Sequence, residues 1–126
     1  MFISGTEKKI EIMKIIAILK VQQYLASLKK VLFEKEYFGF EESAIKYVND
    51  LFDDIVATIA IRPHKPAPEY FDKYGKNMEY AVFRKNKRTS WYVFFRVYKQ
   101  NDEIVYQIRY IANNHSVAQY FNDEQT

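Results

Sequence analysis

Residues 91–98 read Trp-Tyr-Val-Phe-Phe-Arg-Val-Tyr, within a longer run, residues 78–120, that predicts three closely connected β-strands. Because successive side chains of a strand point to opposite faces, this stretch carries two rows of different character. One row is apolar and can build a core: Trp91, Val93, Phe95 and Val97. The other row places aromatic rings around a cation: Tyr92, Phe94, Arg96 and Tyr98. We expect the second row to meet an anionic molecule or another protein.

The segments on either side of this strand predict the rest of the fold. A short apolar strand at 15–19 precedes two helices, at 21–36 and 41–61, whose apolar residues recur at spacings of three and four. A proline-containing but ordered connector follows, and its Tyr70, Phe71 and Tyr74 should pack. Strands are predicted at 77–85, 89–99 and 103–112, with a short helix or extension at 116–121. This order predicts a two-layer α+β domain with both helices on one face of the sheet and the other face open.

Length and composition favour one ordinary soluble domain. The chain has 126 residues, 48% of them hydrophobic and 28% charged. We expect a single domain at 13–126, preceded by residues 1–12 as a flexible arm; Met13 as the true start is an open alternative. No apolar run approaches the ~20 residues of a membrane helix, and no signal-peptide pattern is present, so a cytoplasmic location is the default.

The sequence carries none of the familiar cofactor or metal signatures. The absence of Cys excludes disulfides and thiolate metal sites, and two His without a carboxylate–His cluster argue against zinc. The chain also lacks GxGxxG, GxxxxGK[ST], HExxH and GxSxG motifs. We therefore expect no cofactor and no metal.

Positive charge is concentrated in residues 73–99. This segment holds eight basic residues against the single acid Glu79: Lys73, Lys76, Arg84, Lys85, Lys87, Arg88, Arg96 and Lys99. A patch of one sign attracts polyanions. The alternative is a solvated hairpin whose charged edges discourage strand addition, and charge alone leaves the two interpretations open.

Arg96 and Arg109 are the centre of the candidate site. On the last strand we predict a core row (Ile104, Tyr106, Ile108 and Tyr110) and an outward row (Val105, Gln107 and Arg109). Arg96 and Arg109 would then form a cationic centre flanked by the rings of Tyr92 and Phe94. Single-stranded nucleic acid suits such a face, because its bases stack on rings while its phosphates meet arginine. In the alternative, the two arginines pair with Glu79 or with acids of the helices.

Two residues after the last strand are candidate proton donors or acceptors. His115 stands where the strand ends, and imidazole exchanges protons near neutral pH. Tyr120 is the second candidate, although a phenol ionises only near pH ~10 and would need help from nearby cations. The alternatives are an inert surface histidine and a tyrosine that packs beside Phe121.

Two segments, WYVFFRV at 91–97 and IVYQIRYI at 104–111, accompany the order of elements and the helical hairpin described above. Together, these features of residues 13–121 resemble the RelE/ParE toxin superfamily. The resemblance implies the toxin of a type II toxin–antitoxin module, neutralised by a cognate antitoxin. RelE-like members cleave mRNA on the ribosome by activating a ribose 2′-hydroxyl, whereas ParE-like members poison DNA gyrase.

The resemblance also implies roles for individual residues. Arg96 and Arg109 would hold the scissile phosphate, and His115 or Tyr120 would protonate the leaving 5′-oxygen. Four basic residues would dock ribosomal RNA: Arg84, Lys85, Lys87 and Arg88. Tyr92 stands where the family has an arginine, and basic tail positions fall on asparagines. A ParE-like binding role and a non-toxic relative therefore remain the alternatives, and a homodimer is left open.

Overall fold

The computed structural model describes residues 12–35 and 39–125, with side chains as far as residue 121. The arm predicted for residues 1–12 lies outside this part, except that Ile12 begins the first strand. The elements follow the order β1 (Ile12–Ala17), α1 (Leu19–Glu34), α2 (Glu41–Thr58), β2 (Lys65–Pro66), η1 (Glu69–Tyr74), β3 (Glu79–Arg84), β4 (Ser90–Gln100), β5 (Glu103–Asn113), α3 (Asn114–Val117) and η2 (Ala118–Gln125), where η is a 3₁₀ helix. The predicted α+β order, a strand, two helices and then antiparallel strands, is confirmed.

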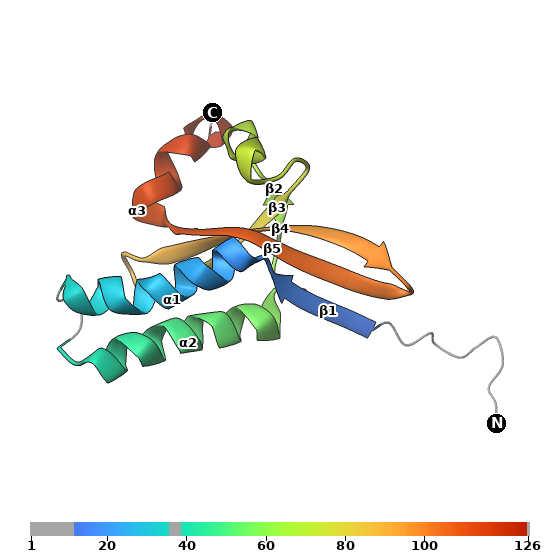
Figure 1. The fold of residues 1–126 in the computed structure, drawn as a ribbon. Coiled ribbons are helices and arrows are strands. Elements are labelled where there is room, and N and C mark those ends of the chain that lie inside the picture. Colours follow the sequence, from blue (N-terminus) through green and yellow to red (C-terminus); the bar gives the residue numbers. More distant parts are fainter. Residues whose placement is uncertain (1–11, 36–38, 126) are drawn as a thin grey trace, which may run out of the picture.

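The strands form one mixed sheet in the order β1-β5-β4-β3-β2. β1 runs parallel to β5, and all other neighbours are antiparallel. Asn101 and Asp102 both adopt positive φ, 50° and 65°, which is the geometry that a two-residue hairpin turn requires between β4 and β5. The tip of this long hairpin and β1 project beyond the helices (Figure 1). The strand β2 was not predicted, because Pro66 and its neighbours indicated a connector.

α1 and α2 lie side by side across one face of the sheet (Figure 1). In α2, Val48, Leu51 and Ile55 are fully buried because their spacings of three and four place them on one side of the helix. They pack against the apolar row of β4 predicted from the sequence, through Trp91 and Phe95. This contact forms the part of the core that faces the helices, here called the helix-side core.

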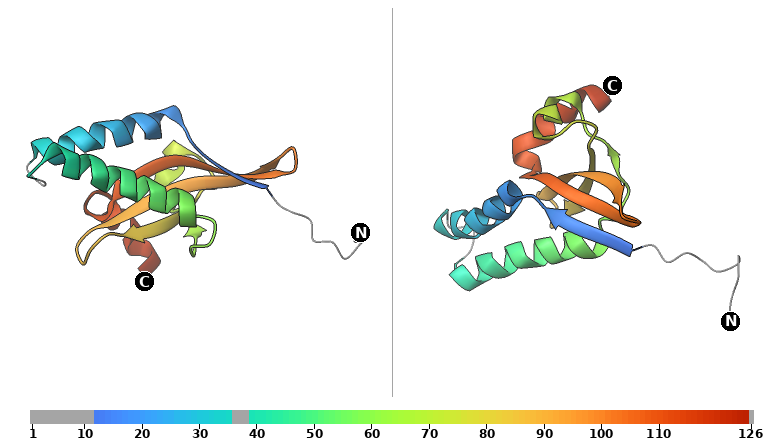
Figure 2. Two further views of the ribbon diagram at one scale, coloured as in Figure 1. Left: turned by 90° about the horizontal axis from the view of Figure 1, so that it is seen from below. Right: turned by 45° about the vertical axis from the view of Figure 1, so that its right-hand side comes forward.

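The opposite face of the sheet is not open, and that prediction is wrong. η1 and the C-terminal elements α3 and η2 fold back over it (Figure 2). They enclose a second core, here called the aromatic cluster, which consists of Phe71, Met78, Tyr80, Phe94, Ala112, Val117 and Phe121. The reason is that the connector and the C-terminal segment each supply a large ring, and burying these rings stabilises the fold more than leaving the row of Phe94 in water.

A β-bulge on β5 changes which residues share a face. Phe94 pairs with Tyr110 and Phe95 with Ile108, so Arg109 is the extra residue between them. Because the alternation slips by one position there, Tyr110 packs against the aromatic cluster while Ile108 stays in the helix-side core. The predicted core row is therefore wrong at Tyr110. None of the described helices is long and apolar enough to cross a membrane.

Candidate functional site: an arginine pair and an aromatic groove

Arg96 and Arg109 come together at one loop. Nε of Arg109 donates a hydrogen bond to the carbonyl oxygen of Tyr74 at 2.7 Å, and Nε of Arg96 donates to that of Lys76 at 3.2 Å. The bulge aims Arg109 towards this loop, and Nη1 of Arg109 also donates to Oε1 of Gln107 at 3.0 Å. We call Arg96, Arg109 and the loop of residues 74–76 the arginine site. Two guanidinium groups from neighbouring strands thus share one backbone support.

Gly75 makes this arrangement sterically feasible. Its φ of 152° lies in the region that favours glycine, and a Cβ at this position would lie 2.6 Å from Nε of Arg109. Any larger residue would therefore displace the guanidinium. Gly75, which directly follows η1, is thus the residue that makes room for Arg109.

Neither arginine is neutralised by a carboxylate within the described residues. The alternative, in which they pair with Glu79 or with acids of the helices, does not hold for these residues, because Glu79 instead contacts Nδ1 of His64 at 2.9 Å. The Nη atoms of Arg96 have no hydrogen-bond partner among those residues. The arginine site therefore keeps its positive charge and several N–H donors for an external anion.

Two stacked pairs of tyrosines border the arginine site. The rings of Tyr74 and Tyr110 stack at 3.8 Å, and those of Tyr70 and Tyr120 stack at 3.5 Å. Nζ of Lys73 lies 3.8 Å from the centre of the Tyr70 ring. Tyr74 supplies both a stacked ring and the carbonyl that holds Arg109, and Nζ of Lys73 also lies 5.6 Å from the Tyr74 ring. Lys73 therefore connects the two tyrosine pairs, and the pairs and the arginines form one continuous surface.

The ionisation of this cluster differs from the prediction for Tyr120. Hydrogen bonding with Lys73 lowers the pKa of Tyr70, and the hydrogen bond with Tyr120 lowers it further. The pKa of Tyr120 is raised, chiefly because of its hydrogen bond to Tyr70. Burial raises the pKa of Tyr110. The nearby cation Lys73 thus favours the ionised form of Tyr70, not of Tyr120. Tyr70 was predicted only to pack, although the sequence Glu-Tyr-Phe-Asp-Lys-Tyr at 69–74 already places Lys73 three residues after it.

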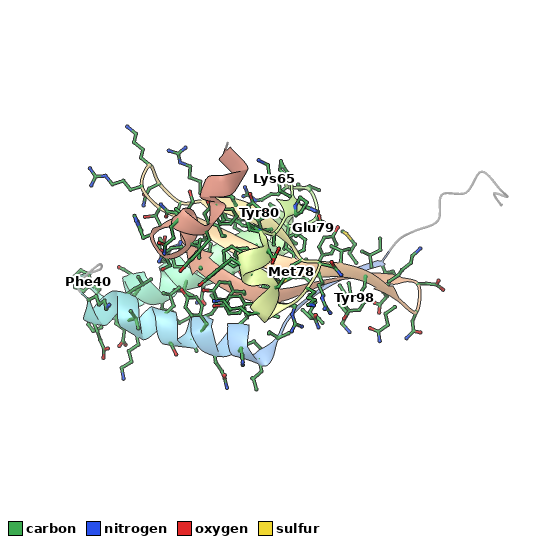
Figure 3. All side chains as sticks on the ribbon, turned by 90° about the horizontal axis from the view of Figure 1, so that it is seen from above. Phe40, Lys65, Met78, Glu79, Tyr80 and Tyr98 are labelled. Atoms are coloured by element: carbon green, nitrogen blue, oxygen red, sulfur yellow. The ribbon has the colours of Figure 1, made fainter. Side chains whose placement is uncertain are left out.

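The two rings predicted to stack on bases are largely covered. Phe94 is 0% exposed and stacks on Phe71 at 4.3 Å, so the prediction that its ring lies on an open face is wrong. Tyr92 is half-buried against Tyr80 and Phe121. Tyr98 lies on the projecting part of the hairpin, whereas Met78 and Tyr80 lie beneath the covering elements (Figure 3). On this face of the sheet, the candidate rings for stacking on a base are therefore those of the pairs Tyr74–Tyr110 and Tyr70–Tyr120.

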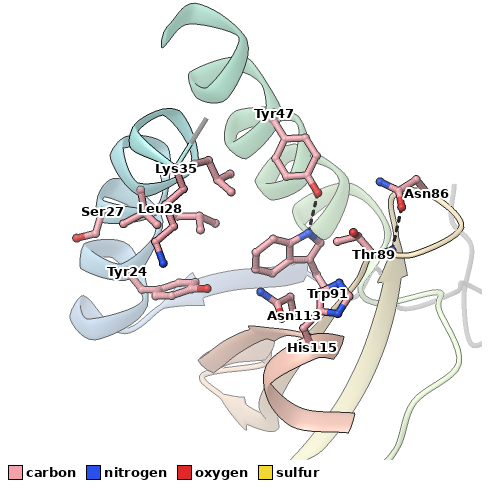
Figure 4. A pocket seen from close by; sticks show the side chains of 12 residues that line it. Tyr24, Ser27, Leu28, Lys35, Tyr47, Asn86, Thr89, Trp91, Asn113 and His115 are labelled. Carbon is pink, nitrogen blue, oxygen red and sulfur yellow. Dashed lines mark hydrogen bonds between the residues drawn. The ribbon is translucent and has the colours of Figure 1, made fainter. Parts of the chain in front are cut away.

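His115 lies away from the arginine site, in a groove of about 750 Å³ between the helices and the end of the sheet. Figure 4 shows side chains from α1, α2, the β3–β4 hairpin and α3 converging on it. Its walls include Tyr24, Leu28, Tyr47, Trp91, Asn113 and His115. Nε1 of Trp91 donates to the Tyr47 hydroxyl at 2.9 Å, which fixes both rings. Burial raises the pKa of Tyr24.

The basic β3–β4 hairpin lies at the groove end of the sheet. It carries the four residues predicted to dock RNA, all of them exposed or half-buried: Arg84, Lys85, Lys87 and Arg88. Asn114 anchors it, because its Oδ1 accepts from the Ser90 N–H at 3.0 Å and its Nδ2 donates to the Arg88 carbonyl at 3.1 Å. The asparagine that stands where the family has a basic tail residue therefore holds the hairpin in place.

The structure divides the predicted catalytic residues into two groups. Arg96, Arg109 and Tyr120 border one continuous surface, but His115 does not belong to it. Asn113, the last residue of β5 before α3, lies four positions beyond Arg109, which spans about 13 Å at the rise of a strand. Within the described residues, no group of three or more His, Cys, Asp or Glu side chains is arranged to hold a metal ion.

Comparison with protein families, curated proteins and solved structures finds no match to this chain. The resemblance to the RelE/ParE toxins therefore stays a prediction, and the arguments on function below start from the geometry of the site.

Proposed function

We propose that the protein is the toxin of a type II toxin–antitoxin module and an endonuclease that cleaves mRNA at the ribosome. The observation that carries the proposal is the pair of guanidinium groups of Arg96 and Arg109, held by one loop and free of carboxylate partners in the described part of the chain. Charge-assisted hydrogen bonds from arginine suit the geometry of a phosphate. The scissile phosphate is therefore placed at the arginine site.

The bordering tyrosines supply the rest of the RNA contact. Tyr70 is partly exposed, and a base that stacks on the Tyr70–Tyr120 pair would gain about 1–3 kcal/mol, the usual contribution of base–aromatic stacking. Lys73 and Lys76 are exposed beside it and add positive charge along the path of a bound RNA strand. The surface thus combines stacking rings with cations, as binding of single-stranded RNA requires.

In the proposed reaction the ribose 2′-oxygen attacks the adjacent phosphorus and the bond to the 5′-oxygen breaks. The 2′-hydroxyl proton passes to a base, and the leaving 5′-oxygen receives a proton, so the products are a 2′,3′-cyclic phosphate and a 5′-hydroxyl. Arg96 and Arg109 stabilise the charge that develops on the phosphate oxygens. Tyr70, whose pKa Lys73 lowers, is better suited to exchange protons than Tyr120, whose pKa is raised.

A second candidate function is a non-catalytic toxin that binds DNA gyrase in the ParE manner. The observation that favours it is the separation of His115 from the arginine site, which leaves the site without the histidine that was expected to move protons there. In either case we propose a cytoplasmic protein whose partner is a cognate antitoxin. A relative without toxicity would leave bacterial growth unaffected on induction.

The test is induction of a variant that carries both Arg96→Gln and Arg109→Gln. We expect growth arrest and the cleavage of ribosome-bound transcripts to disappear while the thermal unfolding curve stays cooperative. The matched control, Lys20→Gln with Lys46→Gln, removes the same charge from exposed helix positions and should remain toxic. DNA damage with intact transcripts would instead support the gyrase-binding alternative, and full toxicity of the arginine variant would contradict the proposal.

A further inference from the structure

We infer that the groove beside His115 binds one nucleotide of an RNA strand, with its base against the aromatic wall and its phosphate at Lys35 and His115. This goes beyond the proposed cleavage site and takes from it only the class of substrate. The volume of about 750 Å³ falls within the ~300–1,000 Å³ of typical small-ligand sites. The groove lies at the other end of the sheet from the arginine site and shares no residue with it.

The chemistry of the groove's walls selects an anionic ligand rich in hydrogen-bond acceptors. No carboxylate is present among the described residues that line it. Lys35 and His115 point into it from opposite sides (Figure 4). The Nδ2 groups of Asn86 and Asn113 have no partner in the described structure, because the bonds of these side chains are made through Oδ1. The groove thus offers the ammonium group of Lys35, the imidazole of His115 and two amide donors.

The apolar part of the groove suits a planar ring. Tyr24 and Tyr47 form the accessible aromatic walls, and the hydrogen bond from Trp91, which is only 2% exposed, holds Tyr47 in a fixed position before any ligand arrives. Leu28 and Leu32 close the apolar side. A nucleobase fits this combination, because its faces stack on rings while its edges accept hydrogen bonds from amides. A purely aliphatic ligand would leave the donors of the groove without partners.

The surroundings of the groove favour a nucleotide within a strand over a free one. The β3–β4 hairpin borders the groove through Asn86 and Thr89, and Nζ of Lys85 lies 5.3 Å from the Tyr47 ring. Its four basic residues therefore lie where the phosphates next to a bound nucleotide would pass. Phosphate contacts of this kind position a strand without reading its sequence.

Trp91 is the only tryptophan of the chain, so its fluorescence reports directly on the groove. Titration with a nucleoside, its 5′-monophosphate and a short oligoribonucleotide should change this fluorescence with increasing affinity in that order. Lys35→Gln should weaken monophosphate binding about tenfold, the contribution of one charge-assisted hydrogen bond, and leave nucleoside binding unchanged. Tyr24→Leu should weaken all three, whereas Tyr98→Leu, a matched change outside the groove, should weaken none.

The outcomes separate this inference from the proposed function. A Trp91 response that persists in the Arg96→Gln, Arg109→Gln variant supports the groove as an independent site, even if that variant remains toxic. Absence of any response to the oligoribonucleotide overturns the inference, including when the arginine variant has lost toxicity. A response to free monophosphate that equals the response to the oligomer overturns the assignment to a strand and indicates a mononucleotide site.

Discussion

The two faces of the sheet are both buried, but by different means. Two long helices cover the first face through aliphatic side chains such as Leu51 and Ile55, which recur regularly along the helix. The second face is covered by the short elements η1, α3 and η2, which are anchored by single large rings, Phe71 and Phe121. A short element covers only part of a face, so polar and charged side chains reach its margin. The arginine site lies at this margin, beside the end of η1.

The contrast explains where the candidate chemistry is located. On the helix-covered face, the regular contact leaves little room for a charged side chain among the buried residues. On the aromatic face, the bulge at Arg109 allows Arg109 to bond to the η1 end while Tyr110 packs under Tyr74. The irregularity of the strand therefore delivers one charged and one aromatic residue to the same region.

We expect the largest effect from truncating one buried side chain on each face of the sheet and comparing the two variants. Phe71→Ala and Leu51→Ala both remove fully buried side chains, and we expect each to lower the free energy of unfolding by about 3–5 kcal/mol, as measured by chemical denaturation. Phe71→Ala should also weaken RNA binding under conditions where the variant is folded, because η1 and the loop at residues 74–76 lose their anchor. Equal loss of RNA binding in folded Leu51→Ala would contradict this distinction.

A smaller change tests the margin of the aromatic face without altering charge. Gly75→Ala introduces a Cβ against Nε of Arg109 at an unfavourable φ, and we expect it to lower the free energy of unfolding by about 1–3 kcal/mol. RNA binding should fall with the displacement of Arg109, as measured by fluorescence anisotropy of a labelled strand. Gly39→Ala is the matched control, since among the described residues no atom beyond its chain neighbours lies within 4 Å of its new Cβ. Comparable binding by the two variants would show that the position of Arg109 is unimportant.

The smallest effect concerns the ionisation of the exposed tyrosines. Lys73 favours the phenolate of Tyr70, so Tyr70 should ionise at lower pH than an ordinary tyrosine. Lys73→Gln removes the positive charge and should raise the pKa of Tyr70, moving the first step of the tyrosinate absorbance titration to higher pH. Tyr70→Phe should remove that step, and Lys76→Gln should leave it unchanged. Superimposable titrations of Lys73→Gln and the native protein would refute the pairing.

Periodicity in the sequence was enough to predict the order of elements and the helix-covered face. Spacings of three and four marked α1 and α2, and the alternation of Trp91, Val93 and Phe95 marked the side of β4 that faces them. These signals are local, because each depends on residues within one element. For the same reason Arg96 and Arg109 could be assigned to neighbouring strands.

The remaining features depend on contacts between segments distant in sequence. The covering of Phe94 requires Phe71 and Phe121 to meet over it, which no local pattern encodes. The bulge at Arg109 depends on the register between two strands, and it reverses the face assigned to Tyr110. The separation of His115 from the arginines follows from the docking of α3. The sequence prediction grouped His115 with the arginines by residue type alone, and residue type carries no information about this docking.

Cleavage of RNA on purified ribosomes tests the central claim most directly. The native protein should cut ribosome-bound mRNA and leave fragments with 2′,3′-cyclic phosphate and 5′-hydroxyl ends, and Arg96→Gln with Arg109→Gln should abolish these ends. The Lys20→Gln, Lys46→Gln control should cut like the native protein. If the arginine variant cuts as fast as the native protein, or if the native protein leaves the mRNA intact, the arginine site is not a ribonuclease centre.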